Sequence, residues 1–376
     1  MPGKTLIKVY GALYKCTRVA LHYRVLLASM ACDKHRHRVV CVNVSAWKAS
    51  TESVDQLMGQ LQAEERTRCN RFRMDIDKKR SLVGRILLRW MAHAETSQPW
   101  GDIQLARTKD NKPYLVAPRG LTQSNFNMNV SHHGNWVAGT SSSDAIVGVD
   151  VMRYERPRGC KSVPDFFDTM RQYFTPHEWA YIEAEENVDE VDEEYTPAAQ
   201  RKTDLSSPPT SSSITVASSR EQEGEGSDAE DGETKAGAMA RASDKLSASE
   251  FTQLRKFYLH WALKESYIKA IGVGLGFELS RAEFRFLAGT SPVRENVQLF
   301  IDGVHQTRWS FYIHEPDPEH CVVVGFGPFA DATPHFQEVL QPGWATGKPT
   351  EVSQGNPAVE FCTRAVPDLK ERDQSN

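Results

Sequence analysis

The sequence predicts an α+β fold, in which helices are combined with mainly antiparallel strands. With 376 residues, of which 40% are hydrophobic, the chain is long enough to bury a substantial core. Segments with an apolar residue at every second position predict strands, and longer stretches with an apolar period near 3.6 predict helices. Because both kinds of segment occur in mixed order along the chain, the α+β class is favoured.

The elements of the N-terminal part follow from these two periods. Val40, Val42 and Val44 alternate along a strand predicted at 37–45. Two amphipathic helices are predicted at 53–68 and 77–94. Turns that contain Gly, Pro and Asn then separate short predicted strands at 103–107, 126–131, 136–140 and 145–152.

In the C-terminal part, two capping boxes mark the starts of helices. Thr175 with Glu178 opens the first helix, and Ser247 with Glu250 opens a second, longer one. Gly272 is expected to end this long helix. Beyond it, alternating segments predict strands at 283–287, 297–301, 308–313 and 321–325.

Composition excludes several classes of protein. Seven cysteines without a C-x-x-C spacing indicate neither a disulfide framework nor a zinc cluster, so a reducing compartment is expected. Charged residues interrupt every apolar stretch well before the roughly 20 residues of a membrane-spanning helix. We therefore expect a cytosolic protein with neither a membrane nor a nucleic acid as partner.

An acidic insertion dominates the net charge of −4. The segment 183–248 holds 17 acidic and 6 basic residues, so its net charge is −11 and the rest of the chain carries +7. Because this segment is rich in Ser, Pro, Gly and Ala and almost free of large apolar residues, residues 184–248 are expected to be disordered. The insertion is either a solvated loop or a segment that binds a partner.

A carboxylate interrupts the apolar face of the long C-terminal helix. Phe257, Trp261 and Ile268 share one stripe of this helix, and Glu265 lies in the middle of it. Burying an ionised carboxylate without a partner is unfavourable. Glu265 is therefore expected either to form a structural ion pair with Lys269, four residues further on, or to face a functional site.

A second acid lies in an apolar strand. One face of the strand predicted at 145–152 is formed by Ile146, Gly148, Asp150 and Met152. Asp150 either caps the turn that follows the strand or belongs to a site. If Asp150 and Glu265 converge next to lysines, they are typical of a site for Mg²⁺ and a phosphate, since this ion takes one or two protein carboxylates together with waters and phosphate oxygens.

Polar and basic residues that precede both acids in the chain suggest an anionic ligand. Asn129, Ser131 and His132 lie where a strand runs into a turn, and the basic residues Arg107, Lys109 and Lys112 precede them. Each base is either a solvated surface charge or a contact to an anion. The neighbouring histidines at 132 and 133 point to opposite faces of a strand, which argues against a zinc site.

These motifs resemble those of the 4′-phosphopantetheinyl transferases. The similarity lies in the segment WALKESYIKA at 261–270, in VGVD at 147–150 and in NVSH at 129–132. The continuation IGVGLGFEL at 271–279 is closest to the monomeric, pseudo-dimeric group that serves eukaryotes as the aminoadipate-semialdehyde dehydrogenase phosphopantetheinyl transferase. The resemblance covers residues 38–326 and is interrupted by the acidic insertion.

The resemblance implies two similar α+β subdomains related by pseudo-two-fold symmetry, each a small, mainly antiparallel sheet packed with a long helix. The implied reaction moves the 4′-phosphopantetheine arm of coenzyme A, the co-substrate, to a serine hydroxyl of an apo acyl or peptidyl carrier protein. It releases 3′,5′-ADP and depends on Mg²⁺. The expected domains are a basic, poorly ordered extension at 1–34, halves at 35–152 and 153–335 with the insertion in the second, and a flexible tail at 336–376.

The resemblance also implies roles for individual residues. Asp150 and Glu265 would be Mg²⁺ ligands, and Glu265 would also take the serine proton, while Lys264 and Lys269 would neutralise the pyrophosphate. The implied catalytic residues are Glu265, Lys269 and Asp150. Contacts to coenzyme A are implied for Arg68, for which Arg66 is the alternative, and for Arg107, Lys109, Lys112, Asn129, Ser131, His132, Lys264 and Lys269.

One position departs from the family pattern. Many members carry a further carboxylate two residues after the strand aspartate, where this chain has Met152, a poor ligand for a hard cation. A water is expected to take that place. Two other functions stay open: a non-catalytic module that binds coenzyme A or carrier proteins, and an interaction protein that uses its acidic insertion.

Overall fold

The computed structural model describes residues 36–96, 98–116, 125–184, 246–287, 297–340 and 358–364. The basic extension and nearly all of the acidic insertion therefore lie outside the described residues. The helices are α2 (Thr51–Gly59), α3 (Ala63–Asn70), α4 (Asp75–Thr96), α5 (Val163–Met170), α6 (Pro176–Glu183), α8 (Ala248–Ile271) and α9 (Pro334–Val339).

The strands form small sheets. They are β1 (Arg36–Asn43), β2 (Leu105–Arg107), β3 (Pro113–Leu115), β4 (Asn127–His133), β5 (Trp136–Ser142), β6 (Ile146–Arg153), β7 (Ala282–Phe286), β8 (Val297–Ile301), β9 (Val304–His305), β10 (Ser310–Asp317), β11 (His320–Gly327) and β12 (Ala358–Arg364). The sheet orders are β12-β1-β5-β4, β10-β11-β6, β2-β3 and β7-β8-β9. The α+β prediction is confirmed.

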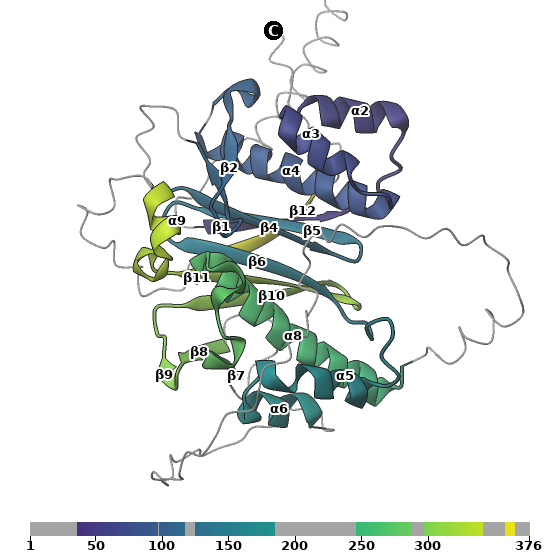
Figure 1. Cartoon of the computed structure of the whole chain (residues 1–376), viewed down its shortest axis with the longest axis vertical. Coiled ribbons are helices and arrows are strands. Elements are labelled where there is room, and N and C mark those ends of the chain that lie inside the picture. The colour runs from purple at the N-terminus through teal and green to yellow at the C-terminus, as the bar shows by residue number, and fades with distance from the viewer. Residues whose placement is uncertain are drawn as a thin grey trace, which may run out of the picture.

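The β12-β1-β5-β4 and β10-β11-β6 sheets lie face to face between layers of helices (Figure 1). Helices α2, α3 and α4 cover the outer face of the β12-β1-β5-β4 sheet, and α8 packs on the outer face of the β10-β11-β6 sheet. The core between the sheets is apolar and includes Val39, Cys41, Ala138, Val147, Val149, Val322 and Val324. The central strands are therefore buried on both faces, by the facing sheet on one side and by helices on the other.

Pseudo-two-fold symmetry relates the two halves. In the first half a strand, β1, is followed by the long helix α4 and the hairpin β4–β5, and the strands lie in the order β1-β5-β4. In the second half β6 is followed by the long helix α8 and the hairpin β10–β11, and the strands lie in the order β6-β11-β10. The predicted architecture of two similar subdomains is confirmed.

Strand β6 corrects the boundary between the halves. The expected division puts residues 146–152 in the N-terminal half, but β6 pairs antiparallel with β11 along its whole length, from Ile146 opposite Gly327 to Arg153 opposite His320. The boundary therefore falls in the turn before β6. The periodicity of a strand shows which residues share a face but not which strand is its partner, and so it could not place this boundary.

Two further expectations need correction. The single helix predicted at 53–68 is two helices, because Gln62 has an extended backbone and forms a capping box with Glu65 that starts α3. The flexible tail expected from residue 336 begins within α9 and contains β12, which pairs in parallel with β1. By pseudo-symmetry, β12 takes the edge of β1 that corresponds to the edge of β6 facing β4.

Other local predictions are confirmed. The capping boxes of Thr175 with Glu178 and of Ser247 with Glu250 open α6 and α8, and Gly272 ends α8 in the left-handed conformation with a φ of 76°. Among the helices that the structure describes, none combines the length and the apolar character needed to cross a membrane.

Strand β6 and helix α8 are in backbone contact at Gly148. A Cβ atom added there would overlap the carbonyl oxygen of Ser266 and the amide nitrogen of Ala270. Because only a residue without a side chain permits this approach, Gly148 sets the distance between the strand that carries Asp150 and the helix that carries Glu265.

Alanine at Gly148 is expected to lower the free energy of unfolding by about 1–3 kcal/mol, because the added methyl group must push α8 away from β6. Urea unfolding measures this change. Alanine at Gly101, where an added Cβ meets nothing within 4 Å, is the matched control and should change stability by less than about 0.5 kcal/mol. Equal effects at both glycines would contradict the close contact.

Candidate active site

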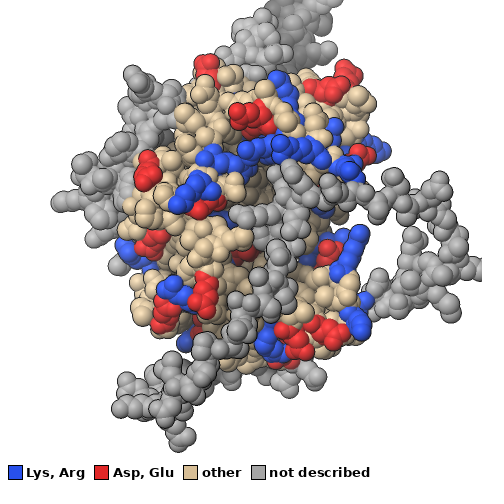
Figure 2. Space-filling model, viewed as in Figure 1, with Lys and Arg blue, Asp and Glu red and all other residues tan. Residues whose placement is uncertain are grey.

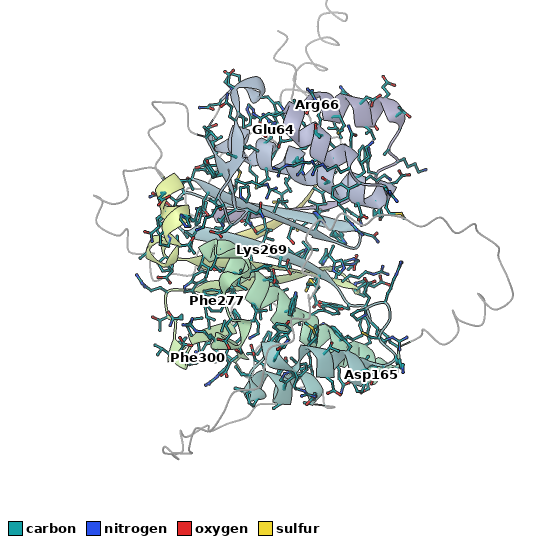
Figure 3. The ribbon with its side chains drawn as sticks, in the orientation of Figure 1. Glu64, Arg66, Asp165, Lys269, Phe277 and Phe300 are labelled. Atoms are coloured by element: carbon teal, nitrogen blue, oxygen red, sulfur yellow. The ribbon has the colours of Figure 1, made fainter. Side chains whose placement is uncertain are left out.

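Two carboxylates and one ammonium meet where β6 faces α8. Asp150 lies on the face of β6 that packs against the helix, and Glu265 and Lys269 lie one turn apart on α8. The Nζ atom of Lys269 donates to Oδ1 of Asp150 and lies 4.0 Å from Oε2 of Glu265. Figure 3 shows Lys269 at the end of α8 that reaches the sheets. The convergence of the two acids therefore comes from tertiary structure.

Burial controls the electrostatics of this cluster. The side chain of Asp150 is 3% exposed and that of Glu265 is 18% exposed. Burial and, to a lesser extent, the charge of Asp150 raise the pKa of Glu265, the charge of Lys269 lowers it, and the net result is a pKa of about 6. Burial alone would lower the pKa of Lys269, but the charges of Asp150 and Glu265 outweigh it and the net shift is upward. Lys269 is thus a fixed cation beside a carboxylate that is unusually easy to protonate.

Asp150 has capacity for one more ligand. Its Oδ1 atom accepts hydrogen bonds from Lys269 and from the hydroxyl of Ser131 (2.8 Å). Its Oδ2 atom is buried and has no hydrogen-bond partner among the described residues. A buried carboxylate oxygen without a partner fits a bound cation, which would satisfy it.

A hard cation would find few other protein ligands here. Within the described part of the chain, no group of three or more His, Cys, Asp and Glu side chains could hold a metal ion. Asp150 and Glu265 therefore offer only carboxylate oxygens, and waters and substrate oxygens would complete the coordination. Such a donor set suits Mg²⁺, which keeps several waters, better than Zn²⁺.

Side chains of β4 cover the free edge of β6 and so join the two halves. At alternate positions they accept hydrogen bonds from alternate amides of β6, at 2.9–3.3 Å: Asn127 from Val147, Asn129 from Val149, Ser131 from Val151 and His133 from Arg153. We call this row the β4–β6 seam. Because β6 pairs with β11 on its other edge, the seam satisfies amides that would otherwise lack acceptors.

Alanine at Asn129 is expected to lower the free energy of unfolding by about 1–3 kcal/mol, because the buried amide of Val149 loses its acceptor. The KM for coenzyme A should stay the same, since the carbonyl group of Asn129 serves the seam. Urea unfolding and steady-state kinetics check the two parts. A raised KM at unchanged stability would instead support the contact with coenzyme A that the family resemblance implies for Asn129.

Lys264 does not belong to the site, and its prediction as a pyrophosphate contact is corrected. Its side chain is fully buried and its Nζ forms an ion pair with Glu178 at 2.8 Å. The same nitrogen donates to the carbonyl oxygens of Leu279 and Ala282, so its three donor hydrogens all have protein acceptors. Burial lowers its pKa. Because successive residues of a helix are about 100° apart, Lys264 lies on a different side of α8 from Glu265, and the structure shows that this side faces Glu178.

Lys112 is also buried, contrary to the prediction that it contacts coenzyme A. Its Nζ donates to the carbonyl oxygens of Val147 (2.7 Å) and Lys269 (2.6 Å), and the ring of Phe336 lies 4.6 Å from it. Neighbouring Arg107 and Lys109 are exposed, and Arg107 donates to the carbonyl of Asn111 in the β2–β3 turn. These two bases can still reach a ligand.

His132 lies among cations of which only Lys269 was predicted as a site residue from the sequence. Burial, followed by the positive charges of Arg80, Lys269 and Arg85, lowers the pKa of His132 to about 4. Arg85 and Arg80 lie on α4, on the opposite side of the seam from α8. Arg85 is a buried charge among apolar residues of α4, and this is the same signal that identified Glu265 in α8, so the sequence did contain it.

The predicted contacts on α3 lie in the outer layer. Arg66 and Arg68 are both exposed, and Figure 3 shows Arg66 well separated from Lys269. Helix α3 is fixed to α4 through Glu65, whose carboxylate accepts from Arg89 at 3.0 Å and whose carbonyl accepts from Arg85 at 3.4 Å. A ligand that touches α3 and also the acidic cluster must therefore be extended.

Comparison with known families agrees with this geometry. Residues 45–144 match the family model described as 4′-phosphopantetheinyl transferase, N-terminal, and residues 233–324 match that of the 4′-phosphopantetheinyl transferase superfamily. The first match lies in the half that carries β4, and the second contains the whole of α8. The second match therefore includes Glu265 and Lys269, whereas Asp150 lies between the two matched ranges.

Similar proteins extend over most of the chain. A phosphopantetheinyl transferase of Thraustochytrium sp. is 33% identical over 298 residues, which are 78% of this chain and 81% of that protein. An L-aminoadipate-semialdehyde dehydrogenase-phosphopantetheinyl transferase of Homo sapiens is 30% identical over 294 residues, 77% of this chain and 74% of that protein. A 4′-phosphopantetheinyl transferase of Bacillus subtilis is 35% identical over 102 residues. The chain therefore belongs to the 4′-phosphopantetheinyl transferase superfamily and is an enzyme of that class.

Proposed function

We propose that this chain transfers the 4′-phosphopantetheine arm of coenzyme A to a serine hydroxyl of an apo acyl or peptidyl carrier protein. The observation that carries the proposal is the meeting of Asp150, Glu265 and Lys269 beside the seam between the halves. In the reaction the serine oxygen bonds to the β-phosphorus, and the bond from this phosphorus to the bridging oxygen breaks. The leaving group is 3′,5′-ADP.

Glu265 is the proposed base. Its pKa, raised to about 6 by burial, leaves it ionised at neutral pH but more basic than an ordinary carboxylate, which favours removal of the serine proton. Lys269 is the proposed electrostatic partner of the reacting phosphate. Because Asp150 and Glu265 already hold this ammonium in place, it needs no reorganisation when negative charge develops.

Asp150 and Glu265 are the proposed ligands of Mg²⁺. The buried Oδ2 atom of Asp150, which lacks a partner among the described residues, supports this assignment. When bound, the ion would neutralise charge on the phosphate oxygens. Met152 follows Asp150 on the same face of β6 and supplies no oxygen, so we propose that a water fills that position.

An extended anion fits the arrangement of basic residues. Figure 2 shows a row of Lys and Arg side chains across the part of the molecule where α3 and α4 lie. These helices and the turn between them carry Arg66, Arg68, Arg71, Arg73, Lys78, Lys79 and Arg80. We propose that coenzyme A runs from this basic surface, past Ser131 and His132, to the acidic cluster, with Arg107 and Lys109 as further contacts.

Other finer points are also proposals. The names of the relatives suggest that carrier domains of a lysine-pathway reductase are among the targets, beside those of fatty acid and polyketide synthesis. Two halves within one chain form both sides of the site, which supports a monomer. We further propose that the protein acts in the cytosol.

The decisive experiment incubates the purified chain with an apo carrier protein, coenzyme A and Mg²⁺ and determines the intact mass of the carrier. The expected result is a carrier that has gained one phosphopantetheine arm, and no gain when EDTA replaces Mg²⁺. An unmodified carrier, while a known transferase modifies it in parallel, would refute the proposal and leave a non-catalytic binding module.

The same assay tests whether the acidic insertion is the functional part. The N-terminal end of the insertion lies against the first turns of α8, since the carbonyls of Glu183 and Ala184 accept from Gln253 (3.3 Å) and Lys256 (2.9 Å), and its C-terminal end leads directly into that helix. A short linker can therefore replace residues 185–245 without moving α8. We expect transfer to persist, and its loss in this variant would favour the interaction-protein alternative.

A further inference from the structure

Lys112 reaches from the N-terminal half into the C-terminal half. It closes the β2–β3 turn, where its amide donates to Oγ1 of Thr108 (3.1 Å) and its carbonyl accepts from the amide of Thr108 (2.9 Å). Its side chain then enters the interior, since the residue is only 4% exposed. The position of this lysine is thus set by a rigid turn in one half and by contacts in the other.

The two carbonyls that Lys112 binds belong to the two elements that form the catalytic cluster. Val147 lies on β6, three residues before Asp150, and Lys269 is itself a member of the cluster. One nitrogen atom therefore joins the backbone of the strand that carries one acid to the last turn of the helix that carries the other. Gly148 sets the distance between the same two elements, because it lies where the backbones of β6 and α8 touch.

The glycine-rich turn after α8 packs against the β2–β3 turn. Gly272 and Gly274 have φ angles of 76° and 62°. A Cβ at Gly272 would lie 3.2 Å from Cδ of Lys112, and one at Gly274 would lie 3.5 Å from Asp110. The end of α8 is thus held from outside the helix, and a cation next to its last carbonyls is favourable for the helix dipole.

The contact does not depend on the ionisation of Lys112. Burial lowers its pKa to about 7, so both forms occur near neutral pH. A neutral amine keeps two N–H donors, which is the number of carbonyl oxygens that Lys112 serves. The hydrogen bonds can therefore persist on both sides of pH 7.

We propose that Lys112 is a positioning residue, which holds the last turn of α8 against β6 and thereby keeps Lys269 and Glu265 opposite Asp150. This inference rests on the proposed function. It replaces the direct contact with coenzyme A that was expected for Lys112. It also explains the glycines after α8, which let this segment pack closely against Lys112 and Asp110.

The test compares Lys112→Met with Lys256→Met. Methionine keeps the apolar stem beside Phe336 but removes both donors. Lys256 is a matched control because it is also buried, donates to a main-chain carbonyl and lies on the same helix, about 20 Å before Lys269. For Lys112→Met we expect kcat to fall roughly 10- to 100-fold while the KM for coenzyme A stays within about threefold. For Lys256→Met we expect wild-type kcat at a comparable loss of thermal stability.

Hydrogen exchange supplies a readout that does not need activity. The backbone amides of residues 266–272 should exchange faster in Lys112→Met than in the wild type and in Lys256→Met. Unchanged exchange there, an equal fall in kcat in both variants, or a raised KM for coenzyme A with unchanged kcat would overturn the proposal. If the wild type transfers no arm at all, the proposed function fails, and the exchange data alone decide whether Lys112 holds the end of α8.

Discussion

Replacing Glu265 by glutamine is expected to lower kcat roughly 10²- to 10⁴-fold, the range by which a positioned base accelerates a reaction. Glutamine keeps the size and shape of the side chain and its ability to accept hydrogen bonds, but it cannot take the serine proton or carry a negative charge. Transfer to an apo carrier, measured by intact mass over time, gives the rate.

The stability of the Glu265→Gln variant, unlike its activity, should not fall. Because the pKa of Glu265 is raised from 4.5 to about 6, mainly by burial, the ionised carboxylate costs about 2 kcal/mol of folding stability above pH 6, and this cost is lost progressively as the pH falls from about 6 to about 4.5. Glutamine has no charge to bury, so at pH 7.5 in EDTA the variant should be at least as stable as the wild type. Loss of activity together with a lowered Tm would instead indicate that Glu265 is a structural ion-pair partner of Lys269.

Replacing Asp150 by asparagine is expected to abolish transfer and also to destabilise the fold by about 3–5 kcal/mol. Asp150 is the buried, hydrogen-bonded counter-ion of Lys269, and without it the ammonium keeps only the carboxylate of Glu265, 4.0 Å away. Activity and urea unfolding are measured on the same preparation. Asp144→Asn, at an exposed position just before β6, is the control and should match the wild type in both.

The double variant Asp150→Asn with Lys269→Met separates the two effects. Removing the ammonium, which without Asp150 keeps only Glu265 at 4.0 Å, should restore part of the lost stability. Activity should not return, since both the proposed Mg²⁺ ligand and the proposed phosphate contact are then absent. A double variant that regains transfer would show that Asp150 and Lys269 form only a structural pair.

Local structure was largely predictable. The strands around Val40 and Asp150, the two capping boxes and the stop at Gly272 depend on residues within a few positions of one another, and the structure confirms them. The helix predicted at 53–68 was wrong for a reason of the same short range, because the capping box at Gln62 interrupts the apolar period. The apolar period favoured one continuous helix, and the capping box at Gln62 favoured a new helix start, which is what the structure has.

Strand partners were not predictable in the same way. The alternation along β6 correctly gives the face of Asp150, but nothing in it indicates that β6 pairs with β11 while its other edge is covered by side chains of β4. Similarly, β12 pairs with β1, which is more than 300 residues earlier in the chain. Such partners are chosen by what buries the remaining surface and satisfies the remaining amides.

The different surroundings of Lys264 and Lys269 show what the sequence decides and what the tertiary structure decides. By itself the sequence determined that α8 carries an acid within its apolar stripe with a lysine on either side, because helical period and residue type are local. Only the tertiary structure decided that Glu178 pairs with Lys264, that backbone carbonyls use up its other donors, and that Asp150 meets Lys269. The reason is that a charge is assigned its role by the groups within about 4 Å of it, and folding brings those groups from distant parts of the chain.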